Sequence, residues 1–413
     1  MPLKILLVSE EFPPETPGWG GIGSYVECIA PALARRGHEV HVLSCAMAHR
    51  TGDGLEDGVW VHRRRLPRIR GASRLRFGET AHRAWLGAFN YREARRLRTI
   101  FDVVEYPDWD AEGWMFAALG NVPTVAHLHT PLTLALRHKG VRESTDTRLA
   151  GRLERMSVSR ATAVTSPSAV LAVEIAAMGW VERDAIQVIP YPIESQQWVT
   201  PPASGTGRIV QFAGRLDARK APEVLIDAIA ILRDEMPDVS ARFAGEYDAA
   251  GSSGLPRLAW SSPRSFARSF DGCTFLGHVA RGKLGELYAS SRVFAQPSVF
   301  ENFSFATLEA MAAGRAAVVT SGSGLAPFIA DCGGGAVVAP RDPAALASAL
   351  KPYLIDAAYA GEAGERARAA VRREFDPKRI ALLREELYGA AIESFRMSRP
   401  HSSPAHAGVR PLP

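Results

Sequence analysis

Short apolar runs and longer stretches with helical spacing alternate along the first half of the chain. The run Lys4–Ser9 precedes a turn-rich segment, after which apolar residues recur at helical spacing from Ile22 to Arg36, and Gly37 ends that pattern. Further runs with the length and residue types of strands lie at Glu39–Ser44, Val59–His62, Val103–Glu105, Thr124–Leu128, Ala163–Thr165 and Gln187–Ile189. Strands that alternate with helices predict a parallel sheet covered by helices on both faces.

The same pattern restarts after residues 200–207, whose sequence TPPASGTG has the composition of a linker. The second half has strand candidates at Arg208–Ala213, Ala241–Ala244, Cys273–Leu276, Val293–Gln296, Ala316–Thr320 and Ala336–Val338. Its helix candidates are Ala221–Glu235, Arg281–Ser290, Ser304–Ala313, Pro343–Leu354 and Pro377–Phe395. This half is therefore predicted to form a second open α/β unit.

These patterns predict an α/β protein with two Rossmann-like parallel-sheet domains that face a central cleft. We expect an amino-terminal domain over residues 1–200, a carboxy-terminal domain over 201–376, a terminal helix over 377–398 and a mobile tail over 399–413. Open sheets of this kind bind ligands at the carboxyl ends of their strands, so the cleft is the expected site.

Composition agrees with a folded protein that is not a membrane protein. Of the 413 residues, 46% are hydrophobic and 23% are charged, and no stretch approaches the roughly 18 apolar residues that cross a bilayer. The apolar run near the start is too short for a secretory signal, so we expect a cytoplasmic protein. The four cysteines are scattered without paired spacing, which favours reduced thiols.

Positive charge is concentrated in residues 61–100, which hold twelve arginines against Glu79 and Glu93. The stretch Arg63–Arg76 could contact an anionic membrane surface or attract a phosphorylated acceptor. The acidic residues that directly follow the block favour the alternative that they neutralise part of it. No zinc-finger or RNA-binding pattern accompanies the arginines, so nucleic acid is not an expected partner.

The segment Gln296–Thr320 carries the most informative chemistry. Glu301 lies in a loop after a strand, and Glu309 lies on the helix that begins near Ser304. The free N–H groups around Asn302 to Ala306 predict an anion site with the helix dipole behind it. Two carboxylates that flank such a site could bind hydroxyl groups on either side of a diphosphate. A sugar and a ribose are the natural candidates.

Two glycine-containing turns add to this interpretation. The sequence FAGRLDARKA places Arg215 and Lys220 at a strand-to-helix turn, where two cations could neutralise a diphosphate without a metal. Gly20 and Gly21 precede the first helix and let its backbone approach phosphate oxygens. The spacing is not that of the dinucleotide fingerprint, which makes a dehydrogenase the weakest alternative.

Together these segments resemble the retaining GT-B-fold glycosyltransferases of the family 4 (group 1) kind. The matching stretches are EEFPPETPGWGGIGSYV, HLHTP, VTSPSAV, VIPYPIE, GRLDARK, FLG and the two-glutamate segment. The resemblance implies that a nucleoside-diphosphate sugar is the donor and that no cofactor is needed.

The resemblance also implies roles for individual residues. Arg215 and Lys220 would bind the donor diphosphate, and Glu309 would bind the ribose. Glu301 and the N–H groups of Phe303 and Ser304 would bind the donor sugar. Gly21 would approach the phosphates, and His129 would contact the transferred sugar near its reacting carbon.

Three positions depart from the family pattern. Ser304 stands where glycine is usual, Tyr191 replaces the usual asparagine in VIPYPIE, and Gly314 is followed by arginine and alanine instead of the usual turn. The carboxylates and cations are intact, so these changes bear on the choice of sugar more than on the class of reaction.

The acceptor side offers two alternatives. Asp108, Trp109 and Asp110 lie in the sequence YPDWDAEGW, where carboxylates suit amines and aromatic faces suit sugar rings, as in a small polar or glycan acceptor. Alternatively, the Arg63–Arg76 stretch recruits a phosphorylated or membrane-borne acceptor.

Metal binding has weak support in the sequence. The D-x-D of Asp108 and Asp110 is the pattern with which another glycosyltransferase fold holds Mg²⁺ or Mn²⁺, but chance alone produces it at this composition. His127 and His129 share one face of a strand but lack a third ligand at suitable spacing. We therefore expect no metal. The remaining alternatives are a sugar-nucleotide epimerase on the same fold and a non-catalytic sugar-nucleotide sensor.

Overall fold

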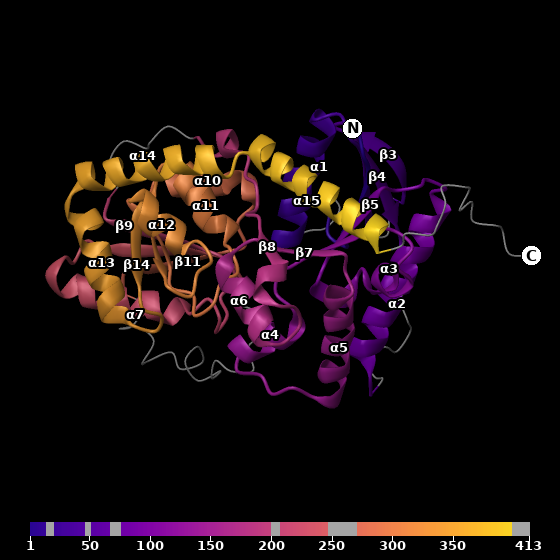
Figure 1. Cartoon of the computed structure of the whole chain (residues 1–413). Coiled ribbons are helices and arrows are strands. Elements are labelled where there is room, and N and C mark those ends of the chain that lie inside the picture. Colours follow the sequence, from indigo (N-terminus) through magenta and orange to yellow (C-terminus); the bar gives the residue numbers. More distant parts are fainter. Residues whose placement is uncertain (14–19, 46–50, 67–75, 200–206, 247–270, 399–413) are drawn as a thin grey trace, which may run out of the picture.

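The computed structural model describes residues 1–13, 20–45, 51–66, 76–199, 207–246 and 271–398 (Figure 1). Their strands form two separate sheets, one of residues 4–188 and one of residues 209–338. The first sheet has the strand order β3-β4-β2-β1-β5-β6-β7-β8. These strands are β1 (Lys4–Val8), β2 (Glu39–Cys45), β3 (Gly52–Glu56), β4 (Val59–Arg64), β5 (Val103–Pro107), β6 (Thr124–His127), β7 (Ala163–Ser166) and β8 (Ile186–Val188).

Helices cover both faces of this sheet because its strands are apolar on both sides. Every residue of β5 and β6 is buried, as are four of the five residues of β1. The helices of this lobe are α1 (Gly21–Arg35), α2 (Gly78–Arg96), α3 (Trp114–Leu119), α4 (Leu132–His138), α5 (Thr145–Ser159) and α6 (Ala169–Ala177). A short 3-10 turn, η2 (Trp109–Ala111), follows β5.

The second sheet has the order β11-β10-β9-β12-β13-β14, and all its pairings are parallel. Its strands are β9 (Ile209–Ala213), β10 (Ser240–Ala244), β11 (Cys273–Gly277), β12 (Val293–Gln296), β13 (Ala316–Thr320) and β14 (Gly335–Val338). Its helices are α7 (Pro222–Glu235), α10 (Arg281–Ala289), α11 (Phe305–Ala312), α12 (Ala326–Cys332), α13 (Pro343–Ile355) and α14 (Ala357–Glu374).

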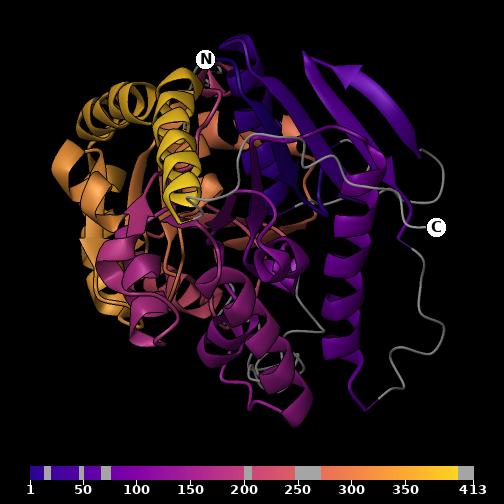
Figure 2. The same cartoon turned by 45° about the vertical axis from the view of Figure 1, so that its right-hand side comes forward.

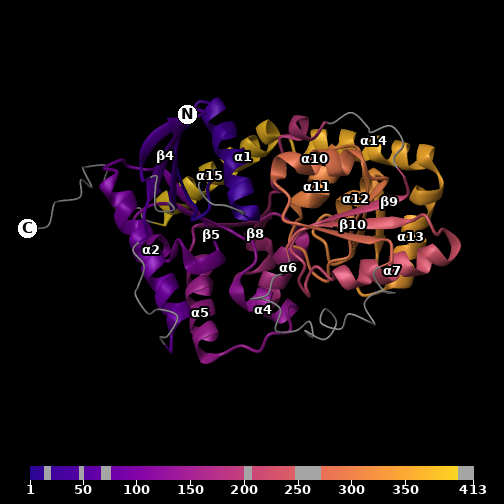
Figure 3. The same cartoon turned by 180° about the vertical axis from the view of Figure 1, so that it is seen from behind.

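The last helix, α15 (Pro377–Met397), returns from the second lobe to the first. It packs beside α1 and against β5 and β6, and Figures 1 and 3 show it lying across the first lobe. Its Arg384 is completely buried there and lies 3.4 Å from the carboxylate of Glu105. The terminal helix is therefore part of the core of the first lobe.

All strands predicted from the apolar runs are present, but one strand was not predicted. β3 pairs antiparallel with β4 at the outer edge of the first sheet (Figure 2). Its sequence, GDGLE, is almost entirely exposed, so it has no apolar pattern to detect. Helix α14 also escaped prediction because the residues that it buries are mostly alanines, which contrast little with their neighbours.

The basic block is partly neutralised by nearby acidic residues. Arg63 forms an ion pair with Glu56, and Arg64 lies 2.7 Å from Asp53. Arg68, Arg70 and Arg74 lie outside the described residues, as does the tail 399–413. The peripheral membrane contact through Arg63–Arg76 stays a prediction. Within the described ranges, no helix has the length and apolar character needed to span a bilayer. All four cysteines are free thiols.

Candidate active site

The two sheets each reverse their strand order at one point, and the predicted site residues gather at these points. In the first sheet the reversal lies between β1 and β5, which Gly20 and Asp108 respectively follow in the chain. In the second sheet it lies between β9 and β12, which Lys220 and Glu301 follow. The crevice at such a switch point is where open α/β sheets bind ligands.

Lys220 and Glu301 are joined directly at the second switch point. Lys220 Nζ donates to Glu301 Oε2, and the guanidinium of Arg219 lies 3.2 Å from the same oxygen. Burial alone would raise the pKa of Glu301, but the two cations hold it below its ordinary value. Arg215, by contrast, is exposed at the end of β9 and has no ion pair with any described residue.

The helix that follows β12 begins with unused N–H groups. Ser304 caps α11 by accepting a hydrogen bond from the N–H of Thr307, although its backbone is left-handed with φ of 83°. Among the described residues, none accepts a hydrogen bond from the N–H of Phe303, Ser304 or Phe305. This end of α11 therefore has the donors and the dipole that bind anions.

Glu309 lies one turn further along α11 and is buried. Its Oε2 accepts a hydrogen bond of 3.2 Å from the hydroxyl of Tyr288, and Arg281 lies 3.5 Å from its Oε1. Burial raises the pKa of Glu309, although Arg281 and Tyr288 act in the opposite direction. The carboxylate is a hydrogen-bond acceptor held in a fixed place, as hydroxyl recognition requires.

The amino end of α1 faces the amino end of α11 across the cleft. A Cβ placed on Gly21 would lie 3.7 Å from the ring of Phe305. The carboxylate of Glu11 already accepts hydrogen bonds from Gly20 N–H, at 2.8 Å, and Gly23 N–H, at 3.3 Å. An acidic side chain therefore occupies the end of α1 that was predicted to approach phosphates.

His129 is held from both lobes. Its N–H donates to Asp108 Oδ1 at 2.8 Å, and its carbonyl accepts a hydrogen bond of 2.6 Å from the side chain of Asn302. Its Nδ1 lies 2.5 Å from the hydroxyl of Tyr191, whose ring stacks on Phe305. Burial, with His127 and Arg384 nearby, keeps the pKa of His129 well below its ordinary value, so the imidazole is neutral at pH 7.

Behind His129 lies a buried polar network from three parts of the chain. Arg384 of α15 lies 3.0 Å from His127 Nε2, and Glu105 accepts hydrogen bonds from Tyr25, at 2.6 Å, and Tyr388, at 2.7 Å. Burial alone would raise the pKa of Glu105, but Arg384 and its other partners lower it to about 2. The positive charge of Arg384 beside His127 disfavours a metal ion at the His127–His129 pair.

The predicted acceptor residues point in different directions. Asp108 is wholly buried and serves His129, so its side chain is not available at the cleft surface. Asp110 is paired with Arg83 at 2.7 Å, and the same guanidinium lies over the ring of Trp109. The D-x-D pair is therefore split, and the acceptor role of these residues stays a prediction.

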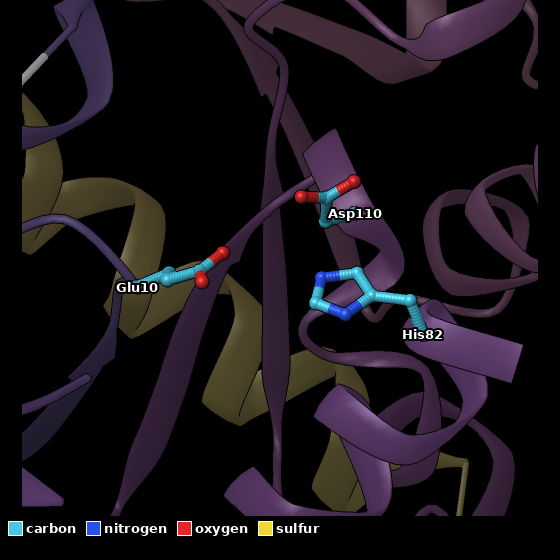
Figure 4. A group of neighbouring side chains, drawn as sticks. All are labelled: Glu10, His82 and Asp110. Atoms are coloured by element: carbon cyan, nitrogen blue, oxygen red, sulfur yellow. The ribbon is translucent and has the colours of Figure 1, made fainter. Parts of the chain in front are cut away.

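Asp110 also belongs to a cluster of side chains near the first switch point. Figure 4 shows Glu10, His82 and Asp110 as neighbouring side chains, and one ligand atom of each lies within 4.8 Å of the others. Burial, with Asp110 and Glu11 nearby, raises the pKa of Glu10 to about 7. The first switch point therefore has an acidic character that could attract positive charge.

Two family models match this chain, one for each lobe. The model of glycosyltransferase family 4 matches residues 19–197, and that of the glycosyl transferases group 1 matches residues 207–356. The chain belongs to this family of glycosyltransferases. It has the GT-B fold of the family, with one Rossmann-like domain on either side of the cleft.

Relatives of this glycosyltransferase span nearly its whole length. Glycogen synthase of Mycobacterium tuberculosis is 29% identical over 96% of this chain and 97% of its own. A D-inositol 3-phosphate glycosyltransferase of Stackebrandtia nassauensis is 26% identical over 86% of this chain and 84% of its own. Sucrose-phosphate synthase from Thermosynechococcus elongatus superposes with a TM-score of 0.75 at 22% identity, covering 95% of this chain and all of the other, which shows the shared fold.

Several residues of the glycosyltransferase site were not predicted from the sequence. Arg219 was visible as a second cation beside Lys220, and Glu11 was visible in the EEFPP stretch, but neither was assigned a role. Arg281, Tyr288 and Arg384 were not assigned a role, because no pattern along the chain shows that α10 turns the first two toward Glu309 or that α15 returns to the first lobe.

Proposed function

We propose that this glycosyltransferase moves a sugar from a nucleoside-diphosphate sugar to a hydroxyl of its acceptor, with retention of anomeric configuration and without a metal ion. The observation that carries the proposal is that α11 begins with unused N–H groups at the switch point where Lys220 pairs with Glu301 and where Arg215 follows β9. These groups supply positive potential where a departing diphosphate would gain negative charge.

In the proposed reaction the acceptor hydroxyl approaches the anomeric carbon on the face from which the diphosphate leaves. The bond from that carbon to the phosphate oxygen breaks, the acceptor oxygen bonds to the carbon, and the departing phosphate takes the hydroxyl proton. No protein carboxylate acts as a nucleophile, in contrast to retaining glycosidases. Glu301, which Lys220 and Arg219 engage, would orient sugar hydroxyls, and neutral His129 would contact the sugar near the reacting carbon.

The relatives do not point to one acceptor. A glycogen synthase and a D-inositol 3-phosphate glycosyltransferase are named for molecules of very different size. We propose that the acceptor of this enzyme enters at the first switch point, beside Glu10, His82 and Asp110. A small polar or glycan acceptor with an amine would match the acidic groups there.

The test begins with thermal unfolding in the presence of UDP, ADP, GDP and CDP. A nucleotide at 100 times its dissociation constant should add about 2.7 kcal/mol of stability. The sugar forms of the binding nucleotide are then incubated with acceptor candidates after exhaustive chelation, and the anomeric configuration of the product is read by NMR. An isomerised donor without acceptor would indicate an epimerase, and binding without any turnover would indicate a sensor.

A further inference from the structure

Arg281 stands between two carboxylates that belong to different lobes. Its Nη1 lies 2.6 Å from Oε2 of Glu27 on α1, and its Nε lies 3.5 Å from Oε1 of Glu309 on α11. The guanidinium also lies 5.6 Å from the ring of Trp198, which precedes the interdomain linker. Arg281, at the start of α10, thus lies near three groups. They are Glu27 of the first lobe, Trp198 just before the linker, and Glu309, the carboxylate expected to bind ribose.

The two ion pairs differ in tightness. The contact with Glu27 is at hydrogen-bond distance, whereas the contact with Glu309 is long. Oε2 of Glu309 is already engaged by Tyr288, so Oε1 is the oxygen left for a ribose hydroxyl. Glu27 therefore draws the arginine away from the oxygen that the ribose would use.

Separation of the lobes would change this balance. Glu27 moves with α1, so an open molecule would leave Arg281 with Glu309 as its remaining carboxylate partner among these residues. A guanidinium closed onto Oε1 would compete with the ribose for the same lone pairs. Closure and ribose binding would then favour each other, as linkage requires.

We propose that Arg281 is a positioning residue that couples ribose binding at Glu309 to closure of the two lobes through Glu27. The inference rests on the proposed function, because it takes Glu309 as the ribose carboxylate. Glu27 itself need not touch the nucleotide.

The experiment measures affinity for the nucleoside diphosphate that binds best among UDP, ADP, GDP and CDP, and for its 2′,3′-dideoxy form. Replacement Glu27→Gln should weaken the ribose form about fivefold and the dideoxy form far less. In an Arg281→Met background, Glu27→Gln should cause no further change. The matched control is Arg35→Met, which removes an exposed 3.1 Å ion pair between α1 and Glu194 and should leave both affinities unchanged.

The outcomes separate the inference from the proposed function. If the wild-type protein binds none of the four nucleotides, the proposed function fails and the inference falls with it. If it binds a nucleotide, three results would overturn only the coupling. They are no effect of Glu27→Gln, an equal loss of affinity for the ribose and dideoxy forms, and the same effect in the wild-type and Arg281→Met backgrounds. Unchanged circular dichroism and thermal unfolding of each variant show that a loss of affinity is not a loss of fold.

Discussion

Ser304 shows how a single residue can be both well bonded and strained. Its hydroxyl caps α11 and donates to Gln296, yet its φ of 83° lies in the region that favours glycine. The family usually has glycine at this position, and the left-handed backbone explains that preference. The serine hydroxyl offsets part of the cost by satisfying buried groups.

Replacing Ser304 tests this balance of strain and capping. Ser304→Gly removes the strain, and a serine-to-glycine change at a helix cap costs only a few tenths of a kcal/mol. Ser304→Ala keeps the strained Cβ and loses the hydroxyl. The glycine variant should therefore be at least about 1 kcal/mol more stable than the alanine variant in urea unfolding. Equal stability of the two would show that the backbone is not strained.

His129 should lower the stability of the protein in mild acid. Its folded pKa is depressed by burial, whereas the unfolded chain binds a proton below about pH 6.5. The unfolded state therefore gains more protons as pH falls, and stability is lost below that pH. The unfolding free energy of wild type should drop relative to His129→Asn by up to about 1.4 kcal/mol per pH unit between pH 6 and 5. A constant difference would mean that His129 titrates normally.

The two carboxylates of the donor site should separate in binding measurements. Glu309→Gln is expected to weaken the free nucleoside diphosphate, because the amide is a poorer acceptor for ribose hydroxyls. Glu301→Gln is expected to weaken mainly the intact nucleotide sugar. Each loss should be about tenfold, near the value of one hydrogen bond to a charged group, by calorimetry. Equal losses on both ligands for both variants would contradict the assignment.

At the scale of secondary-structure elements, a carboxylate already neutralises the positive end of the α1 helix dipole. Glu11 accepts the N–H groups of Gly20 and Gly23, which removes the positive end that a phosphate would otherwise meet. The two facing helix ends are therefore unequal, since the end of α11 has no such carboxylate among the described residues. The donor diphosphate should depend chiefly on α11.

Glu11→Gln should have opposite effects on folding and on binding. Loss of the charge at the helix end should cost about 0.5–1 kcal/mol of stability. Removal of a negative charge from the cleft should at the same time tighten nucleoside diphosphate binding, most clearly at low salt. Thermal unfolding and titration of the same preparation measure both effects. Weaker binding by the variant would instead show that Glu11 orders the glycine turn for the ligand.

At the scale of the whole molecule, α15 ties the end of the chain to the first lobe. Its Arg384 and Tyr388 complete the buried network around Glu105, which also contacts Tyr25 of α1 and His127 of β6. The second lobe is thus followed by a helix that belongs to the core of the first. This connection links the stability of the His129 side of the cleft to the last helix.

Arg384→Met should be strongly destabilising for this reason. It would leave the carboxylate of Glu105 buried without its cation, a change that typically costs about 3–5 kcal/mol. The matched control on the same helix is Arg379→Met, which breaks an exposed 3.0 Å pair with Glu374 and should cost less than about 1 kcal/mol. Urea unfolding of both variants makes the comparison. Similar costs would mean that the tyrosine hydroxyls alone satisfy Glu105.

Most of the strands and helices and the two open sheets could be predicted from the sequence alone, whereas the roles of Arg215, Lys220, Glu301 and Glu309 stay predictions. Apolar periodicity and turn residues are local properties, so they can be read along the chain. The tertiary structure decided which groups meet. Lys220 pairs with Glu301, Asp108 turns inward to His129, and Arg281 reaches both lobes. Such pairings depend on burial and on contacts between distant segments, which no local pattern encodes.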